Sequence, residues 1–441
     1  MSLWASKITA VLLGGNRGNG VNAGSRASNW NNYVWNSNWN IGVRLSCEYK
    51  IWILLSYIVT AYMERPYKIW SAYLSSESKY IERSVKVGVA LIVKEQDSIK
   101  RYIVGKKYKI LFEKIIDIDN LRLAYKKALK GGNRYTTSHL KFKENLEANL
   151  SLLQAQLESG VYRHGNYHTF LVYEPKERLI ASLPFRDRVA QHAINNIVEP
   201  IFESMFYSTS YACRSNKGTH KGVKAVQAKI RKLDNDGSVY YLKMDFSKYF
   251  HSINTDILFR EISKKISDVK VLNLLKGFVS IDSKGIPIGN LLSQLFANIY
   301  GHIFDRFVKT KLKARYYFRY MDDTVILSNC KKELVLYQQK LYLFIKLFMK
   351  LKFSKWYINA ISKPLNFLGY RISQNYKLIR KDSVVRAKRK IKRYKKIDDV
   401  LSLKLFLASW RGHLRSADSW NLVKFINKEE QLCKMKLALS R

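Results

Sequence analysis

Two adjacent aspartates, Asp322 and Asp323, lie where two β-rich segments meet, and this feature constrains the chain more than any other. Aromatic and β-branched residues flank the pair over residues 316–327, a pattern typical of a β-hairpin with a tight turn. Adjacent carboxylates repel each other unless a cation lies between them. A hard divalent cation held by carboxylate oxygens removes that conflict. Asp is also common in solvated turns, so the pair alone leaves both interpretations open.

A third aspartate stands at the end of another β-rich segment. Residues 239–246 predict a strand that finishes with Asp245 and Phe246. Three carboxylates from two neighbouring strands can hold two Mg²⁺ ions, with Mn²⁺ as the alternative, and two-metal sites serve in-line phosphoryl transfer. The two segments are far apart in the chain, so their spacing leaves this arrangement a hypothesis.

Four segments in this order resemble the motifs of reverse transcriptases. Residues 320–323 (Tyr-Met-Asp-Asp) are similar to the YxDD motif, and residues 245–250 are similar to the first acidic motif. Between them, residues 285–294 resemble the PQGxxxSP loop, with Ile288 in place of Gln and Gln294 in place of Pro. Residues 367–370 resemble the later primer-grip motif. The resemblance implies an α+β right-hand polymerase fold with fingers, a palm built on an antiparallel sheet, and a helical thumb.

Each matching position inherits an expected role from this resemblance. An aromatic residue at Phe250 would stack under the sugar and select dNTPs, and Gly289 would let the backbone approach the template base. Lys355 would protonate pyrophosphate, although a solvated Lys fits the segment equally well. The expected residues are Asp245, Asp322 and Asp323 for catalysis and metal binding; Arg214, Phe250, Gln294 and Lys355 for the nucleotide; and Ile288, Gly289, Tyr320, Met321, Phe367, Leu368 and Gly369 for template and primer.

Arg214 is the candidate for the incoming triphosphate. It follows a β-rich segment and precedes a polar loop with a glycine, and an Arg side chain can bind phosphate oxygens through two parallel hydrogen bonds. Arg186 and Arg188 lie near acidic residues, where a structural ion pair is the favoured interpretation.

The two departures from the PQGxxxSP pattern, Ile288 and Gln294, point to one group within the reverse transcriptases. The form GxxxSQ is similar to reverse transcriptases of diversity-generating retroelements, which copy an RNA template repeat with errors at adenines. This implies template RNA, an RNA–cDNA duplex, dNTPs and a small basic accessory variability protein as partners. Ile288 in place of Gln is a candidate contributor to the errors. A retron or group II intron enzyme and a non-catalytic RNA-binding protein remain the alternatives.

The N-terminal region has an unusual composition. Residues 14–44 are crowded with Asn, Trp, Gly and Ser, which fits a small binding module, a disordered tail or a translated template repeat. The resemblance favours the last interpretation, with residues up to about Gly105 translated from template and spacer RNA. The predicted domains are an atypical extension over 1–110, fingers and palm over 111–374, and a basic thumb over 375–441.

Charge and composition favour a nucleic-acid partner. The chain carries 78 Lys and Arg against 34 Asp and Glu, a formal charge of +44, which attracts phosphate backbones without regard to sequence. An anionic membrane surface is the weaker alternative, and the apolar segment Ile51–Met63 is too short to span a bilayer. The cysteines at 47, 213, 330 and 433 have no metal-ligand spacing, which fits a reducing cytoplasm.

Periodicity predicts the remaining elements. Helices are expected over residues 119–130, 140–157, 336–349, 386–396, 403–414 and 420–426, with another that starts at Pro184, and strands are expected over 167–173 and after Lys176. The helix over 386–396 is basic on most sides, which favours contact with an RNA–DNA duplex over a merely solvated face.

Overall fold

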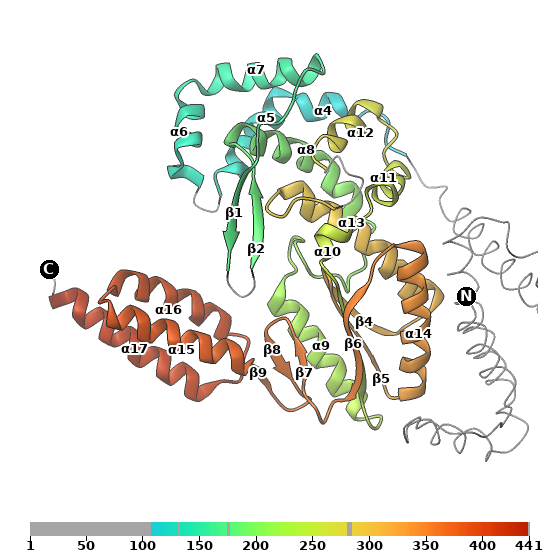
Figure 1. The fold of residues 1–441 in the computed structure, drawn as a ribbon, viewed down its shortest axis with the longest axis vertical. Helices are drawn as coiled ribbons and strands as arrows, with labels where there is room; N and C mark the ends of the chain where they lie inside the picture. Colours follow the sequence, from blue (N-terminus) through green and yellow to red (C-terminus); the bar gives the residue numbers. More distant parts are fainter. Residues whose placement is uncertain (1–106, 131–132, 174–176, 280–284, 440–441) are drawn as a thin grey trace, which may run out of the picture. The chain divides into compact units, whose positions relative to one another are not determined.

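The computed structural model describes residues 107–130, 133–173, 177–279 and 285–439. The chain divides into two units, Met1–Tyr102 and Ile103–Arg441, and every described residue belongs to the second. The template-repeat interpretation, the segment Ile51–Met63 and Cys47 lie outside the described residues. The described part is α+β, with helices and antiparallel sheets (Figure 1). None of its helices is long and apolar enough to cross a membrane.

Helices form the first layer of the described part. Asp117 caps the N-terminus of the helix Ile118–Ala128 through its side chain, which accepts a hydrogen bond from the Asp119 N–H. Leu121, Leu150 and Val189 are fully buried where these helices pack together. The helices are α4 (Phe112–Ile116), α5 (Ile118–Ala128), α6 (Thr137–Glu144), α7 (Leu146–Glu158) and α8 (Phe185–Glu203), with a 3₁₀ turn η1 at Asn133–Tyr135.

One predicted helix is wrong in its extent. The segment expected to form a single helix over 140–157 is α6 followed by α7, because Asn145 leaves the helical region at φ −127° and ψ 58°. Asn favours such breaks, since its side chain offers the backbone alternative hydrogen bonds. The expected apolar face survives, since Leu150, Leu153 and Leu157 are all buried.

A four-stranded antiparallel sheet forms the centre of the second layer. Its strands lie in the order β4 (Tyr316–Tyr320), β5 (Asp323–Ser328), β3 (Tyr240–Phe246) and β6 (Phe353–Ala360). Because side chains alternate along a strand, Leu242 and Met244 pack on one side of the sheet while Tyr241 packs on the other. The predicted strand over 239–246 and the hairpin over 316–327 are confirmed.

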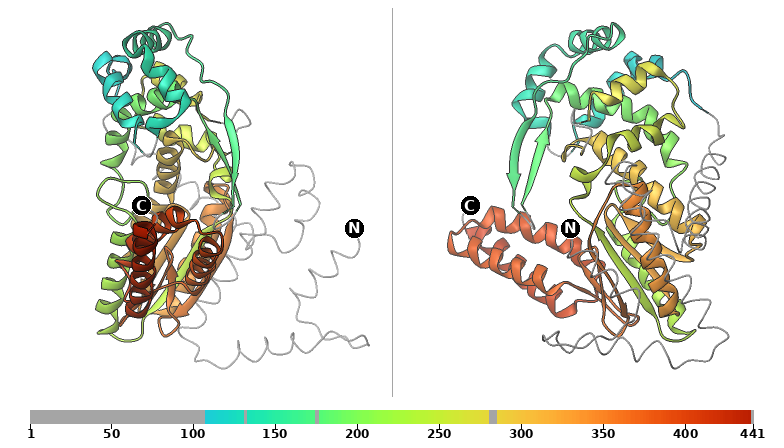
Figure 2. Two further views of the ribbon diagram at one scale, coloured as in Figure 1. Left: turned by 90° about the vertical axis from the view of Figure 1, so that its left-hand side faces the viewer. Right: turned by 45° about the vertical axis from the view of Figure 1, so that its right-hand side comes forward.

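Helices cover both faces of this sheet (Figures 1 and 2). The apolar residues of α13 (Leu291–Arg306) and α14 (Lys331–Phe348) belong to the core on the Leu242 side. Residues of α9 (Thr219–Asp234) belong to the core on the Tyr241 side. The shorter helices α10 (Tyr249–Ser252), α11 (Thr255–Ser263) and α12 (Val269–Lys276) follow β3, and a π-helical turn η2 (Phe307–Lys311) follows α13.

Two smaller sheets and a helical bundle complete the fold. The hairpin β1 (His168–Val172) and β2 (Arg178–Ser182) has an exposed first strand. The sheet β7 (Leu365–Phe367), β8 (Tyr370–Ile372) and β9 (Lys377–Ile379) leads into α15 (Lys381–Lys396), α16 (Val400–Leu414) and α17 (Trp420–Leu439). The Tyr370 hydroxyl donates to the His413 carbonyl at 2.8 Å, which docks α16 on this sheet. The last helix extends well beyond the predicted 420–426.

Candidate active site

The three predicted aspartates converge at one end of the central sheet. Asp245 on β3 pairs directly with Asp323 on β5 in the antiparallel register, and directly opposed residues share one face of a sheet. Asp322 occupies the turn between β4 and β5, where its carbonyl accepts a hydrogen bond from the Phe246 N–H at 3.2 Å. Residues remote in the sequence therefore bring three carboxylates to one place.

The turn itself is held in an uncommon backbone conformation. Met321 adopts φ +53°, although it is not a glycine, and its side chain is buried. A left-handed conformation is unfavourable for a residue with a Cβ. Tyr320 stands opposite Asp323 across the turn. The turn is therefore a strained structure that surrounding contacts must support.

Burial and repulsion by neighbouring carboxylates raise the pKa of Asp322 and of Asp323. Burial raises the pKa of Asp322 to about 6, and the negative charge of Asp245 adds to this effect. Burial also raises the pKa of Asp323, while the positive charge of Lys243 opposes that shift. The ammonium of Lys243, which is itself buried, contacts the Asp323 carboxylate. The site thus concentrates negative charge that Lys243 and Arg380 only partly offset.

The donor set suits a hard divalent cation. Within the described residues, no group of three or more His, Cys, Asp or Glu side chains is already gathered as a metal site. Asp245, Asp322 and Asp323 nevertheless offer carboxylate oxygens, which Mg²⁺ and Mn²⁺ prefer. Burial and the charge of Asp245 raise the pKa of Asp322, so a cation that neutralises the ionised carboxylates would be favoured there. These three residues are the ones that could hold such ions.

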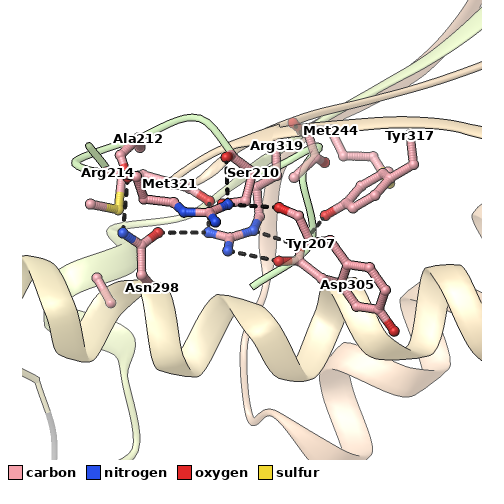
Figure 3. Close-up of polar contacts among 12 residues, drawn as sticks. Tyr207, Ser210, Ala212, Arg214, Met244, Asn298, Asp305, Tyr317, Arg319 and Met321 are labelled. Carbon is pink, nitrogen blue, oxygen red and sulfur yellow. Dashed lines mark hydrogen bonds and ion pairs between the residues drawn. The ribbon is translucent and has the colours of Figure 1, made fainter. Parts of the chain in front are cut away.

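A buried ion pair lies beneath the turn (Figure 3). Arg319 on β4 and Asp305 on α13 are both fully buried and form two hydrogen bonds, of 2.6 Å from Nε and 2.8 Å from Nη2. The Tyr317 hydroxyl donates to the same carboxylate at 2.6 Å. Arg319 Nη1 also donates to the Met321 carbonyl at 3.3 Å. The strained turn is thus tied directly to a helix behind the sheet.

The contacts of Arg214 favour a structural role over the predicted contact with the nucleotide. Its guanidinium forms a bidentate pair with Glu203 at the end of α8. Nη1 donates to the carbonyls of Tyr207 and Ser210 at 2.6 and 2.9 Å. The side chain is only 5% exposed, so its donors face the protein. Arg186 likewise forms the expected structural ion pair, with Asp187 at 2.9 Å.

The backbone at Gly289 lies very close to another part of the protein. Gly289 adopts φ +118°, and an added Cβ would lie 2.8 Å from Ile180 Cγ2 and 2.9 Å from the Ala181 carbonyl oxygen. The Ala181 N–H donates to the Ile288 carbonyl at 2.7 Å. This glycine therefore lets the 285–290 loop pack against β2, and the expected approach to a template base stays a prediction.

The remaining predicted residues occupy varied positions. Lys355 is exposed on β6 directly opposite Asp245, and Gln294 is exposed on α13. Phe250 is half-buried on α10. Phe367 is fully buried, while Leu368 and Gly369 form the positive-φ turn between β7 and β8. Lys355 thus lies next to Asp245. The ring of Phe367 packs in the hydrophobic core.

Three basic residues near the aspartates escaped the sequence prediction. Lys243 stands two positions before Asp245, so strand alternation alone places both on one face. Arg319 is a charged residue within an aromatic strand, which is an unusual pattern for a buried position. Arg380 is the N-cap residue of α15, and its charge acts to lower the pKa of Asp323. Its Nε is buried without a hydrogen-bond partner in the described part of the chain.

Comparisons with known proteins identify the region that carries these residues. Residues 173–372 match the family described as "Reverse transcriptase (RNA-dependent DNA polymerase)". Protein YkfC of Escherichia coli is 28% identical over 37% of this chain and 46% of its own length. The group II intron-encoded protein LtrA of Lactococcus lactis is 25% identical over 49% of this chain and 47% of its own length. The matches thus span about half the length of these relatives.

A solved structure of apo telomerase from Candida tropicalis aligns with 50% of this chain and 56% of its own, at 12% identity and a TM-score of 0.38. The matched family region runs from the end of β1 to β8 and includes all three aspartates and Arg319. Residues 173–372 are therefore a reverse transcriptase domain, with relatives among the group II intron-encoded proteins.

Proposed function

We propose that the chain is an RNA-directed DNA polymerase in which Asp245, Asp322 and Asp323 form the catalytic centre. The observation that carries the proposal is the convergence of these carboxylates within a reverse transcriptase domain. Their negative charge, which Lys243 contacts only at Asp323, favours binding of two divalent cations, Mg²⁺ or Mn²⁺. When bound, such ions activate a primer 3′-hydroxyl and neutralise the pyrophosphate leaving group.

The neighbouring side chains suit the other roles. Lys355 is exposed opposite Asp245, a position compatible with proton donation to pyrophosphate. Half-buried Phe250 on α10 can lie against the sugar of a dNTP, and exposed Gln294 is free to contact the nascent pair. In this proposal residues 111–374 act as fingers and palm, and the helices after 375 act as a thumb.

The basic character of the last helices supports a duplex-binding role. Helix α15 has Lys or Arg at half of its positions or more, and exposed basic side chains attract phosphate backbones. A-form RNA–DNA duplexes are bound mostly through shape and backbone. The proposed substrate is therefore a template RNA paired with its cDNA.

The finer proposal is mutagenic copying of a template-repeat RNA, as in diversity-generating retroelements. Its support is the GxxxSQ loop and the Asn-rich N-terminal composition. A small basic accessory protein is the proposed partner. The second candidate is a retron or group II intron enzyme, and the match to LtrA favours it specifically.

Sequencing of the cDNA separates these two candidates. The full-length chain would extend a primer on an RNA template with Mg²⁺ and dNTPs, with and without a candidate accessory protein. Errors concentrated at template adenines support the retroelement proposal, and accurate cDNA favours the intron-like candidate. Ile288→Gln should reduce the adenine errors, and an unchanged error spectrum would remove Ile288 from the account. RNA binding without any cDNA would favour a non-catalytic RNA-binding protein.

A further inference from the structure

The buried pair of Arg319 and Asp305 needs an explanation beyond stability. Both side chains are fully buried, and desolvation of two charges commonly offsets what their attraction contributes. The pair is nevertheless well hydrogen-bonded, because Nε and Nη2 of Arg319 donate to the two carboxylate oxygens of Asp305. Apolar side chains could fill this space without the cost of desolvating two charges. A positioning role is therefore the stronger explanation for the pair.

The third nitrogen of the Arg319 guanidinium reaches the turn that carries Asp322. Nη1 donates to the carbonyl of Met321 at 3.3 Å and to Asn298 Oδ1 at 3.4 Å. Met321 is the residue at φ +53°, and Asp322 follows it directly. Figure 3 shows the guanidinium between helix α13 and the turn, with Met321 above it. A guanidinium fork has a fixed geometry, so it can fix the orientation of this carbonyl.

The backbone of Arg319 is held from the other side. Its N–H donates to the Thr209 carbonyl at 3.0 Å, and its carbonyl accepts from the Tyr211 N–H at 2.9 Å. The Asn298 side chain donates to the Ala212 carbonyl at 2.9 Å. The segment 209–212 is thus joined both to the strand and to helix α13, which leaves the arginine little freedom to shift.

Helix α13 is shaped to admit the guanidinium. Gly301 lies against it, and an added Cβ would meet Nη1 and would lie 2.6 Å from Cζ of Arg319. Gly in a helix interior is unfavourable relative to Ala. The close approach of Arg319 explains why a glycine occurs at position 301 despite its low helix propensity.

We propose that Arg319, oriented by Asp305 and accommodated by Gly301, is a positioning residue for Asp322. It holds the Met321 carbonyl, and so the left-handed turn, in the conformation that presents Asp322 beside Asp245. This inference rests on the proposed function. It assigns to Arg319 no contact with substrate.

The test compares four full-length variants: Arg319→Lys, Gly301→Ala, the double variant, and Gly412→Ala. Lys keeps the charge and loses the fork, whereas Ala at 301 displaces the guanidinium and leaves the pair's charges in place. Gly412 in α16 is the matched control, because an added Cβ there meets nothing within 4 Å. Thermal unfolding first establishes that each variant is folded at the assay temperature.

Two readouts distinguish positioning from a structural role. The first is primer extension, where kcat should fall about 100-fold in either single variant while KM for dNTP and affinity for RNA stay unchanged. The second is Mn²⁺ binding without substrate, followed by electron paramagnetic resonance of free Mn²⁺, where affinity should fall about tenfold. Gly412→Ala should match the wild type in Mn²⁺ affinity, which is measured without nucleic acid.

The double variant tests the mechanism. If Gly301→Ala acts by displacing the guanidinium, its effect should shrink in the Arg319→Lys background, whereas additive losses would overturn the proposed coupling. Folded Arg319→Lys with wild-type kcat and Mn²⁺ affinity would overturn the positioning role. If the wild type extends no primer, the proposed polymerase function fails, and the Mn²⁺ affinities still decide whether Arg319 positions Asp322.

Discussion

Asp245 lies directly opposite Asp323 in the pairing of β3 and β5. Opposed like charges destabilise a sheet, and the charge of Asp245 raises the pKa of both Asp322 and Asp323. Asp245→Asn should therefore stabilise the fold by about 1 kcal/mol without divalent cations, while it abolishes primer extension. Thermal unfolding in a chelator measures the first effect. Equal melting temperatures for variant and wild type would contradict the account.

Stability should depend on pH through Asp322. Its pKa in the fold is about 6, above the ordinary 3.8, so the ionised carboxyl opposes folding above pH 6. That penalty disappears as the pH falls through 6 towards 3.8. Asp322→Asn should therefore be more stable than the wild type at pH 8, with a smaller difference at pH 5. Chemical unfolding at both pH values measures this, with exposed Asp236→Asn as control.

Lys243 should determine how strongly the site depends on cations. Its ammonium contacts Asp323, so Lys243→Met removes the compensating charge and should destabilise the chelated protein by about 2 kcal/mol. Added Mg²⁺ should then raise the melting temperature more in the variant than in the wild type. Lys221→Met, an exposed lysine on α9, is the control. An identical response to Mg²⁺ in all three proteins would exclude this role.

Arg214 should matter for folding more than for nucleotide binding. Its bidentate pair with Glu203 and its bonds to backbone carbonyls are lost in part in Arg214→Lys. We expect a loss of about 2 kcal/mol of stability and an unchanged KM for dNTP in the folded fraction. A raised KM with unchanged stability would restore the nucleotide contact that the sequence suggested.

Gly289 and Gly160 separate backbone strain from contact. Both adopt positive φ, but only Gly289 has atoms within 4 Å of an added Cβ, from Ile180 and Ala181. Gly160→Ala should cost about 1 kcal/mol from strain alone, and Gly289→Ala should cost clearly more. Denaturant unfolding measures both. Equal losses would mean that β2 moves away freely.

Local sequence patterns predicted the strands that carry the aspartates. They did not predict the ion-pair partners of Arg214 and Arg319, which lie on other elements of the fold. The alternating residues around Asp245 and Asp322 predicted β3 and the hairpin, and the structure brings their aspartates together. The Arg214 sequence context gave no sign of Glu203, whose position depends on how α8 packs. Burial of Arg319 was equally hidden, because its partner Asp305 lies on another element.

Gly289 is another residue whose tertiary contacts could not be predicted from the local sequence. Its sequence position suggested a backbone that another molecule could approach closely, and the structure gives it φ +118°. Which atoms approach it depends on the tertiary placement of β2. The periodicity over 140–157 likewise showed the buried leucines but could not show the break at Asn145, where a single residue leaves the helix.

Primer extension on an RNA template by the full-length chain tests the central claim most directly. The wild type is compared with Asp322→Asn and Asp323→Asn in Mg²⁺ and dNTPs, with RNA affinity measured in parallel. The account predicts cDNA from the wild type, none from either variant, and equal RNA binding by all three. Synthesis that persists in either variant, or a wild type that binds RNA and makes no cDNA, would contradict it.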